Sequence, residues 1–122
     1  MTELQSIAQQ MTQKGKGILA ADESTPTCNK RFDSVGVESS FENRNEYRDL
    51  LITANGMEEY IGGVIMFDET LRQSTTSDKK VLFPDYLIAR GVVPGIKVDK
   101  GAKNLAGFSD EKVTEGLDGL RE

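Results

Sequence analysis

The chain has 122 residues and a formal net charge of −5, so it has the size of one domain and lacks the basic surface that nucleic-acid binding needs. It has one cysteine, no histidine and no apolar stretch of about 18 residues, which excludes an internal disulfide, histidine-ligated zinc and a membrane-spanning helix within these residues. Its first twenty residues lack the apolar core of a signal peptide, so we expect a cytoplasmic protein whose chemistry uses carboxylates, lysines and hydroxyls.

The first predicted element is an amphipathic helix over residues 2–14. Thr2 and Gln5 have the spacing of a capping box, and Gly15 is expected to end the helix. The apolar residues that recur at helical spacing are Leu4, Ile7, Ala8 and Met11. An apolar run over 17–22 follows, and because it is too short for a solvent-exposed helix it predicts a buried strand.

Two helices are predicted before the next strand. The first is a short helix that ends near Phe32 and is followed by a turn over 34–36. The second begins at Ser39, and Asn55-Gly56 is expected to cap its carboxyl end. The expected buried stripe of the second helix is Tyr47, Leu50, Leu51 and Ala54. Its expected solvent-facing residues are Arg44, Glu46, Arg48 and Asp49.

The alternation of strands and helices continues after these helices. A second strand is predicted over 61–67, and a polar, exposed loop over 72–80. Pro84 in a first helical turn and Gly91 after a last turn indicate a compact helix between them. A third strand is predicted over 93–98.

Residues 101–113 are expected to be irregular, and 114–122 to begin another helix. Apolar strands separated by helices are typical of βαβ units in an α/β fold with a parallel sheet. Three such strands would leave unpaired edges and an uncovered apolar face, whereas a closed (β/α)8 barrel needs about 250 residues. We therefore expect the chain to be part of a longer domain.

Two charged residues near predicted strand ends are candidates for chemistry. Asp22 lies where the first strand ends, which is where active sites lie in parallel barrels, although it or Ser24 could instead cap the next helix. In the third strand, alternation places Lys97 and Asp99 on one face. Lys97 has either a function or a salt bridge to Asp99 at an exposed strand end.

A possible anion site follows Asp22. If Thr27 is helical, its hydroxyl and the guanidinium of Arg31 are four residues apart and share a face that suits a phosphate. The neighbouring acids Asp68 and Glu69 are expected to be solvated rather than to bind a metal.

Short motifs with a fixed order and spacing run through most of the chain. They are GKGILAADEST (15–25), KR (30–31), ENR (42–44), IGGVI followed by ETL (61–65 and 69–71), GIKVDKG (95–101), LAG (105–107) and TEGLDGL (114–120). Together they resemble the amino-terminal part of class I fructose-bisphosphate aldolase. The resemblance implies that residues 1–122 are an amino-terminal fragment of a single TIM-barrel domain, holding the first three βα units of its (β/α)8 barrel.

The resemblance also implies a reaction, the reversible cleavage of fructose 1,6-bisphosphate into dihydroxyacetone phosphate and glyceraldehyde 3-phosphate in glycolysis and gluconeogenesis. A lysine forms a Schiff base with the ketone, and neither a metal nor another cofactor is needed. Asp22 falls at the family's aspartate that assists proton transfer, and Lys97 at a substrate-contacting lysine that is not the Schiff-base lysine. Ser24, Thr27 and Arg31 fall at phosphate-binding positions.

The Schiff-base lysine, the acid/base glutamates and a second phosphate-binding arginine belong to later strands of the family, so the 122 residues alone are expected to be inactive. A homotetramer is expected for the full-length protein. Pro26, Thr27 and Asp68 depart from the residues that many members have, and Pro26 removes one backbone donor beside the phosphate. Two alternatives stay open: a non-catalytic phosphosugar-binding or interaction module, and another Schiff-base barrel enzyme with Lys97 as its nucleophile.

Overall fold

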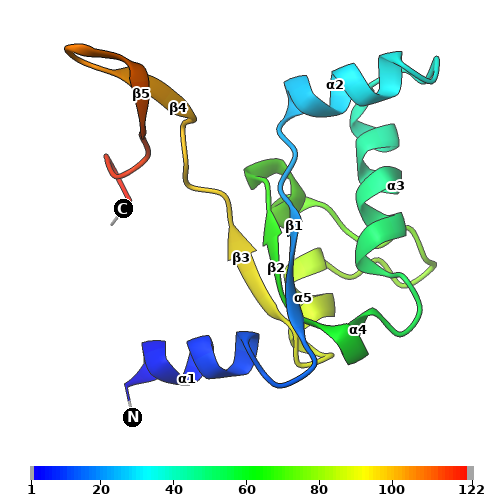
Figure 1. Cartoon of the computed structure of the whole chain (residues 1–122). Coiled ribbons are helices and arrows are strands. Elements are labelled where there is room, and N and C mark those ends of the chain that lie inside the picture. The colour runs from blue at the N-terminus through cyan, green and yellow to red at the C-terminus, as the bar shows by residue number, and fades with distance from the viewer. Residues whose placement is uncertain (1, 121–122) are drawn as a thin grey trace.

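Three short apolar segments form a parallel sheet in the computed structural model, which describes residues 2–120. The strands are β1 (Gly17–Ala21), β2 (Ile61–Met66) and β3 (Val93–Ile96), and β2 lies in the middle (Figure 1). Ala21 pairs with Met66, and Met66 pairs with Ile96. Because these last residues are in register, the carboxyl ends of all three strands lie at the same level.

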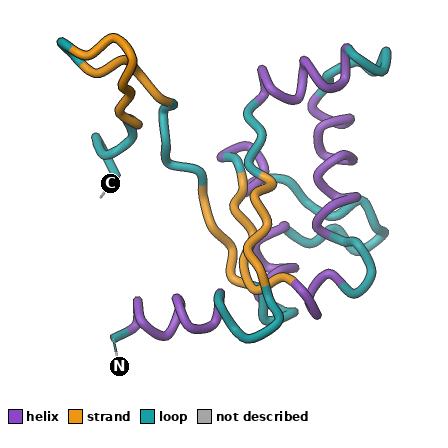
Figure 2. Tube along the Cα trace, viewed as in Figure 1, coloured by secondary structure: helices purple, strands orange, loops and turns teal. Residues whose placement is uncertain are grey.

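Helices connect the strands, as the α/β prediction requires (Figure 2). Three helices join β1 to β2: α2 (Thr25–Asp33), α3 (Phe41–Ile52) and α4 (Met57–Tyr60). A 3-10 helix, η1 (Asp68–Arg72), and α5 (Phe83–Ile88) join β2 to β3. The chain begins with α1 (Glu3–Met11) and ends with the hairpin β4 (Ala102–Leu105) and β5 (Phe108–Thr114). None of the helices described within residues 2–120 is long and apolar enough to cross a membrane.

The first helix has the predicted capping box, in which Thr2 accepts from the backbone N–H of Gln5 and the Gln5 side chain accepts from that of Thr2. It ends at Met11, three residues before the predicted end. Its last turn lies against the start of β2, where a Cβ atom added to Gly62 would come within 2.4 Å of the Met11 carbonyl oxygen. Glycine at this position is therefore required for the close approach of α1.

The hydrophobic core lies between one face of the sheet and the helices that cover it. Buried strand residues meet buried residues of α3, α4 and α5; the cluster contains Ala21, Val64, Met66, Ile52, Met57, Phe83, Leu87 and Val92. The prediction that the first strand is buried is correct only for Ala21. Ile18 on the opposite face of β1 is 45% exposed, because within residues 2–120 the helices cover only one face of the sheet.

The predicted buried stripe of α3 is only partly correct, because two of its four residues are exposed. Leu50 is 73% exposed, and Ala54 is also exposed, whereas Arg44 and Arg48 are buried, with Arg48 only 2% exposed. Ile52 is the fully buried apolar residue of this helix. The face of α3 that packs against η1 is thus polar. Its two guanidinium groups can be buried because Glu69 and Gln73 accept their hydrogen bonds.

The last predicted elements also differ from the structure. Residues 101–113, expected to be irregular, contain most of an antiparallel hairpin whose two-residue turn includes Gly107 with a φ of 83°. No helix forms over 114–120, because Gly116, with a φ of 143°, lies outside helical backbone geometry; residues 121–122 lie outside the described part. In the loop predicted to be exposed, Gln73 and Thr75 are buried.

Candidate active site

A pocket of about 650 Å³ lies at the carboxyl ends of the three strands. The first residue after each strand, Asp22 after β1, Phe67 after β2 and Lys97 after β3, contributes to its lining. The pocket brings together all the site residues predicted from the sequence, namely Asp22, Ser24, Thr27, Arg31 and Lys97. It is also lined by Glu23, Asp99 and Lys100, which the sequence reasoning did not assign to a site.

Lys97 joins the ends of the two outer strands. Its Nζ donates to Asp22 Oδ2 at 3.4 Å and also to Asp99 Oδ2, while its backbone N–H continues the sheet by donating to the Met66 carbonyl at 2.8 Å. The predicted salt bridge to Asp99 is confirmed, and Asp22 joins this pair from the end of β1.

The two carboxylates stabilise the charged form of this lysine. The hydrogen bond to Asp99, followed by that to Asp22, raises the pKa of Lys97. The hydrogen bond from Lys97, with one from the backbone N–H of Gly101, lowers the pKa of Asp99. Lys97 is therefore a protonated ammonium at neutral pH rather than a free amine.

Helix α2 begins at the pocket, and Ser24 occupies its N-cap position. The Ser24 carbonyl accepts from the backbone N–H groups of Thr27 and Cys28, at 2.9 and 3.0 Å. The Ser24 side chain makes no capping bond, and its Oγ lies 3.3 Å from Thr27 Oγ1 instead. Pro26 lies in the first helical turn, where a missing N–H breaks no helical bond. Ser24 thus caps the helix by position, while its hydroxyl and that of Thr27 line the pocket.

Arg31 is held at the edge of the pocket by two side chains that the sequence reasoning missed. Its Nη1 donates to the hydroxyl of Tyr47 at 2.7 Å and also to the carboxylate of Glu23. These two bonds, that to Tyr47 first, raise the pKa of Arg31. The Tyr47 ring in turn packs edge-on against Phe32, with centroids 5.5 Å apart. Tyr47 was predicted only as an apolar stripe residue, and no local pattern pairs it with Arg31.

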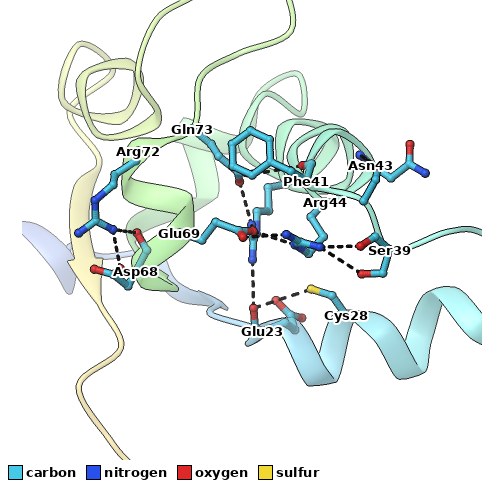
Figure 3. Close-up of polar contacts among 12 residues, drawn as sticks. Glu23, Cys28, Ser39, Phe41, Asn43, Arg44, Asp68, Glu69, Arg72 and Gln73 are labelled. Atoms are coloured by element: carbon cyan, nitrogen blue, oxygen red, sulfur yellow. Dashed lines mark hydrogen bonds and ion pairs between the residues drawn. The ribbon is translucent and has the colours of Figure 1, made fainter.

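A buried ion-pair network lies behind the pocket. Arg44 binds Glu69 with two parallel hydrogen bonds of 2.8 Å, which Figure 3 shows between α3 and η1. Arg48 donates to the same carboxylate. The bond from Arg44, followed by that from Arg48, lowers the pKa of Glu69 to about 2. The expectation of a solvated acidic pair is therefore wrong for Glu69, because α3 supplies two cations; Asp68 is exposed and pairs with Arg72.

The structure defines an α/β protein with a pocket at the carboxyl ends of its parallel strands, where helix α2 also begins. Residues 3–122 match the family model described as glycolytic fructose-bisphosphate aldolase class-I. The chain belongs to the class I fructose-bisphosphate aldolase family, as its motifs indicated.

Relatives from several kingdoms support this membership. The chain is 56% identical over 119 residues to the probable fructose-bisphosphate aldolase class 1 of Xanthomonas axonopodis pv. citri, covering 98% of this chain and 35% of that protein. It is 53% identical over 120 residues to fructose-bisphosphate aldolase 1 of Toxoplasma gondii, and 52% identical over 118 residues to the chloroplastic fructose-bisphosphate aldolase of Spinacia oleracea. The first match covers 98% of this chain and 32% of the Toxoplasma protein. The second covers 97% of this chain and 29% of the spinach protein.

A solved structure is also similar. It is the fructose-bisphosphate aldolase of Plasmodium falciparum, determined in complex with TRAP and a small-molecule inhibitor, with a TM-score of 0.85 and 49% sequence identity. The match covers 97% of this chain and 33% of the Plasmodium chain. The chain thus spans about a third of the length of the relatives that it matches.

Proposed function

We propose that the pocket is one wall of an aldolase active site, and that β1, β2 and β3 with their helices are the first three βα units of a (β/α)8 barrel. The proposed reaction is the cleavage of fructose 1,6-bisphosphate into dihydroxyacetone phosphate and glyceraldehyde 3-phosphate. The observation that carries the proposal is the Asp22–Lys97 pair, which spans the strand ends in the same pocket as the hydroxyls and the guanidinium of α2. A phosphosugar substrate and a homotetrameric assembly are parts of the same proposal.

In this proposal Lys97 acts as a fixed cation. Formation of a Schiff base needs a free amine that attacks the substrate ketone, and the carboxylates on either side keep Lys97 protonated. An ammonium at the strand ends instead stabilises the negative charge of a phosphosugar and of the intermediates that form from it. As the family resemblance implies, we place the Schiff-base lysine beyond residue 122, and we expect residues 1–122 alone to be inactive.

Asp22 is the proton-transferring group of this wall. Its carboxylate lies between the strand end and Lys97 Nζ and is only partly exposed, so a proton can be exchanged with a substrate held in the pocket. Imine formation releases water, and the protonated imine then accepts the electron pair of the breaking carbon–carbon bond. Each of these steps moves a proton, and we assign this transfer to Asp22 because the family resemblance implies it and the carboxylate lines the pocket beside Lys97.

Phosphate binding is assigned to the start of α2. The hydroxyls of Ser24 and Thr27 and the guanidinium of Arg31 line the pocket next to the helix amino terminus, whose partial positive charge favours an anion. A guanidinium also matches the geometry of phosphate oxygens. Phosphate must share Arg31 with Glu23, which the guanidinium already contacts.

The test is reductive trapping with dihydroxyacetone phosphate and borohydride, on the protein as its gene encodes it. We expect one covalent adduct per chain, located by peptide mapping on a lysine outside residues 1–122. The absence of an adduct would refute the Schiff-base proposal, and binding of the phosphosugar without an adduct would favour the non-catalytic module. An adduct on Lys97 would favour the alternative barrel enzyme.

A second test addresses the phosphate wall. Arg31→Met should raise KM for the bisphosphate by about 10- to 100-fold, because a charge-assisted hydrogen bond is worth about 1.5–3 kcal/mol. Arg72→Met is the matched control, since Arg72 is an exposed arginine that pairs with Asp68 and does not line this pocket. Equal KM values for the two variants would contradict the assignment of Arg31.

A further inference from the structure

Arg48 is a buried cation that donates hydrogen bonds to three polar groups of the protein. The side chain comes from α3 and is 2% exposed. Its Nη1 donates to Glu69 Oε1 at 2.5 Å and to Gln73 Oε1 at 2.8 Å, and its Nη2 donates to the backbone carbonyl of Glu23 at 3.3 Å. The guanidinium thus joins η1 and its following residue to the segment that leaves β1.

Two of the groups that Arg48 contacts belong to the pocket wall. Glu23 directly follows Asp22 and lines the pocket. Phe67, the first residue after β2, also lines it, and the Arg48 guanidinium carbon lies 5.9 Å from the centre of its ring. One side chain therefore contacts the residues that follow both β1 and β2, although Arg48 itself does not line the pocket.

The identity of this residue matters for these contacts. A guanidinium has five donors in a rigid plane, so it can bond to acceptors on opposite sides and stack on a ring at once. A lysine has one nitrogen at the end of a flexible stem and cannot reach the Glu69, Gln73 and Glu23 acceptors together. Since a buried ion pair is weak evidence for stability, the contacts to the pocket wall are the more informative part of this network.

We propose that Arg48 is a positioning residue for the active site. It acts through the Glu23 carbonyl and the Phe67 ring, and it fixes the Asp22 carboxylate relative to the Lys97 ammonium 3.4 Å away. The inference rests on the proposed aldolase function. Displacement of a reacting group by about 1 Å can cost about 100-fold in rate, so a loosened wall is expected to reduce kcat.

Arg44 provides a matched comparison, because it lies one turn earlier in α3 and binds the same Glu69 carboxylate. Its remaining bonds go to the carbonyl and the hydroxyl of Ser39, away from the pocket wall (Figure 3). Both arginines are buried and share an acceptor, yet only Arg48 contacts Glu23 and Phe67. A role confined to binding Glu69 would make replacement of either residue affect the rate to the same extent.

The experiment compares Arg48→Lys with Arg44→Lys in the protein as its gene encodes it, with kcat, KM and the thermal unfolding midpoint measured for each. We expect Arg48→Lys to lower kcat about 10- to 100-fold with KM changed by less than about threefold, because the phosphate-binding groups lie on α2. Arg44→Lys should stay within about threefold of the wild type in kcat. Equal losses in the two variants, or a loss confined to KM, would overturn the inference.

Two further readouts keep the outcome decisive. Failure of the wild-type protein to form the borohydride-trapped adduct refutes the proposed function and the inference with it. A normal wild-type adduct together with an unchanged Arg48→Lys rate refutes the inference alone.

If Arg48→Lys does not fold, Gln73→Leu removes one acceptor of the guanidinium and keeps the side-chain volume. A folded Gln73→Leu variant should lose about 3- to 10-fold in kcat, and wild-type kcat in this variant would overturn the inference.

Discussion

Replacement of Glu69 by glutamine should destabilise the folded protein strongly, although glutamic acid and glutamine have nearly the same shape. The carboxylate accepts hydrogen bonds from both Arg44 and Arg48, and both guanidinium groups are buried. Removal of its charge would leave two buried cations without an anionic partner. Breaking a buried pair in this way typically costs about 3–5 kcal/mol.

The pKa of Glu69 gives a second value for this cost. The two arginines hold it at about 2, against an ordinary value of 4.5. The difference corresponds to about 3 kcal/mol of stability at neutral pH, which agrees with the lower end of the first range. Because the pKa is lowered on folding, this stabilisation is fully present above the unfolded-state value of 4.5 and is lost as the pH falls toward 2.

The assay is urea unfolding of wild-type protein and Glu69→Gln, with Asp68→Asn as the control. Asp68 is the neighbouring acid, but it pairs with Arg72 on the surface, where the two side chains are 58% and 69% exposed, so its replacement should change the stability little. The Glu69→Gln difference should stay constant from pH 7 to about pH 5.5 and be about 1.4 kcal/mol smaller at pH 3.5. Equal costs for the two variants, or a difference that grows on acidification, would refute the reasoning.

Two further pairs of substitutions test the packing. Gly62→Ala should lower the free energy of unfolding by about 1–3 kcal/mol, because the added Cβ would lie 2.4 Å from the Met11 carbonyl oxygen, while Gly17→Ala, with open space around it, should have little effect. Ile52→Ala should cost about 2–5 kcal/mol and Leu50→Ala less than about 0.5 kcal/mol in urea unfolding, since Ile52 is fully buried and Leu50 is 73% exposed. A Leu50→Ala cost equal to that of Ile52→Ala would contradict the orientation of α3, and equal stabilities of the two glycine variants would contradict the close approach of α1.

Much of the site was predictable because it depends on local features. Short apolar runs indicated the three strands, although each predicted strand extends one or two residues beyond its observed end. In a parallel sheet the carboxyl ends meet at one edge, so Asp22 and Lys97 could be expected to lie close together although 75 positions separate them. Helical spacing likewise placed Thr27 and Arg31 on one face of α2 beside the same pocket.

The sequence by itself therefore determined the strands, the first helix with its capping box and the residues at the strand ends. Only the tertiary structure decided which face of α3 is buried. Periodicity assumes that buried residues are apolar, but Arg48 is buried because Glu69 and Gln73, 21 and 25 positions away, supply acceptors that no local pattern contains. The same holds for Tyr47, whose hydroxyl reaches Arg31 only because α2 lies across the upper end of α3 (Figure 1).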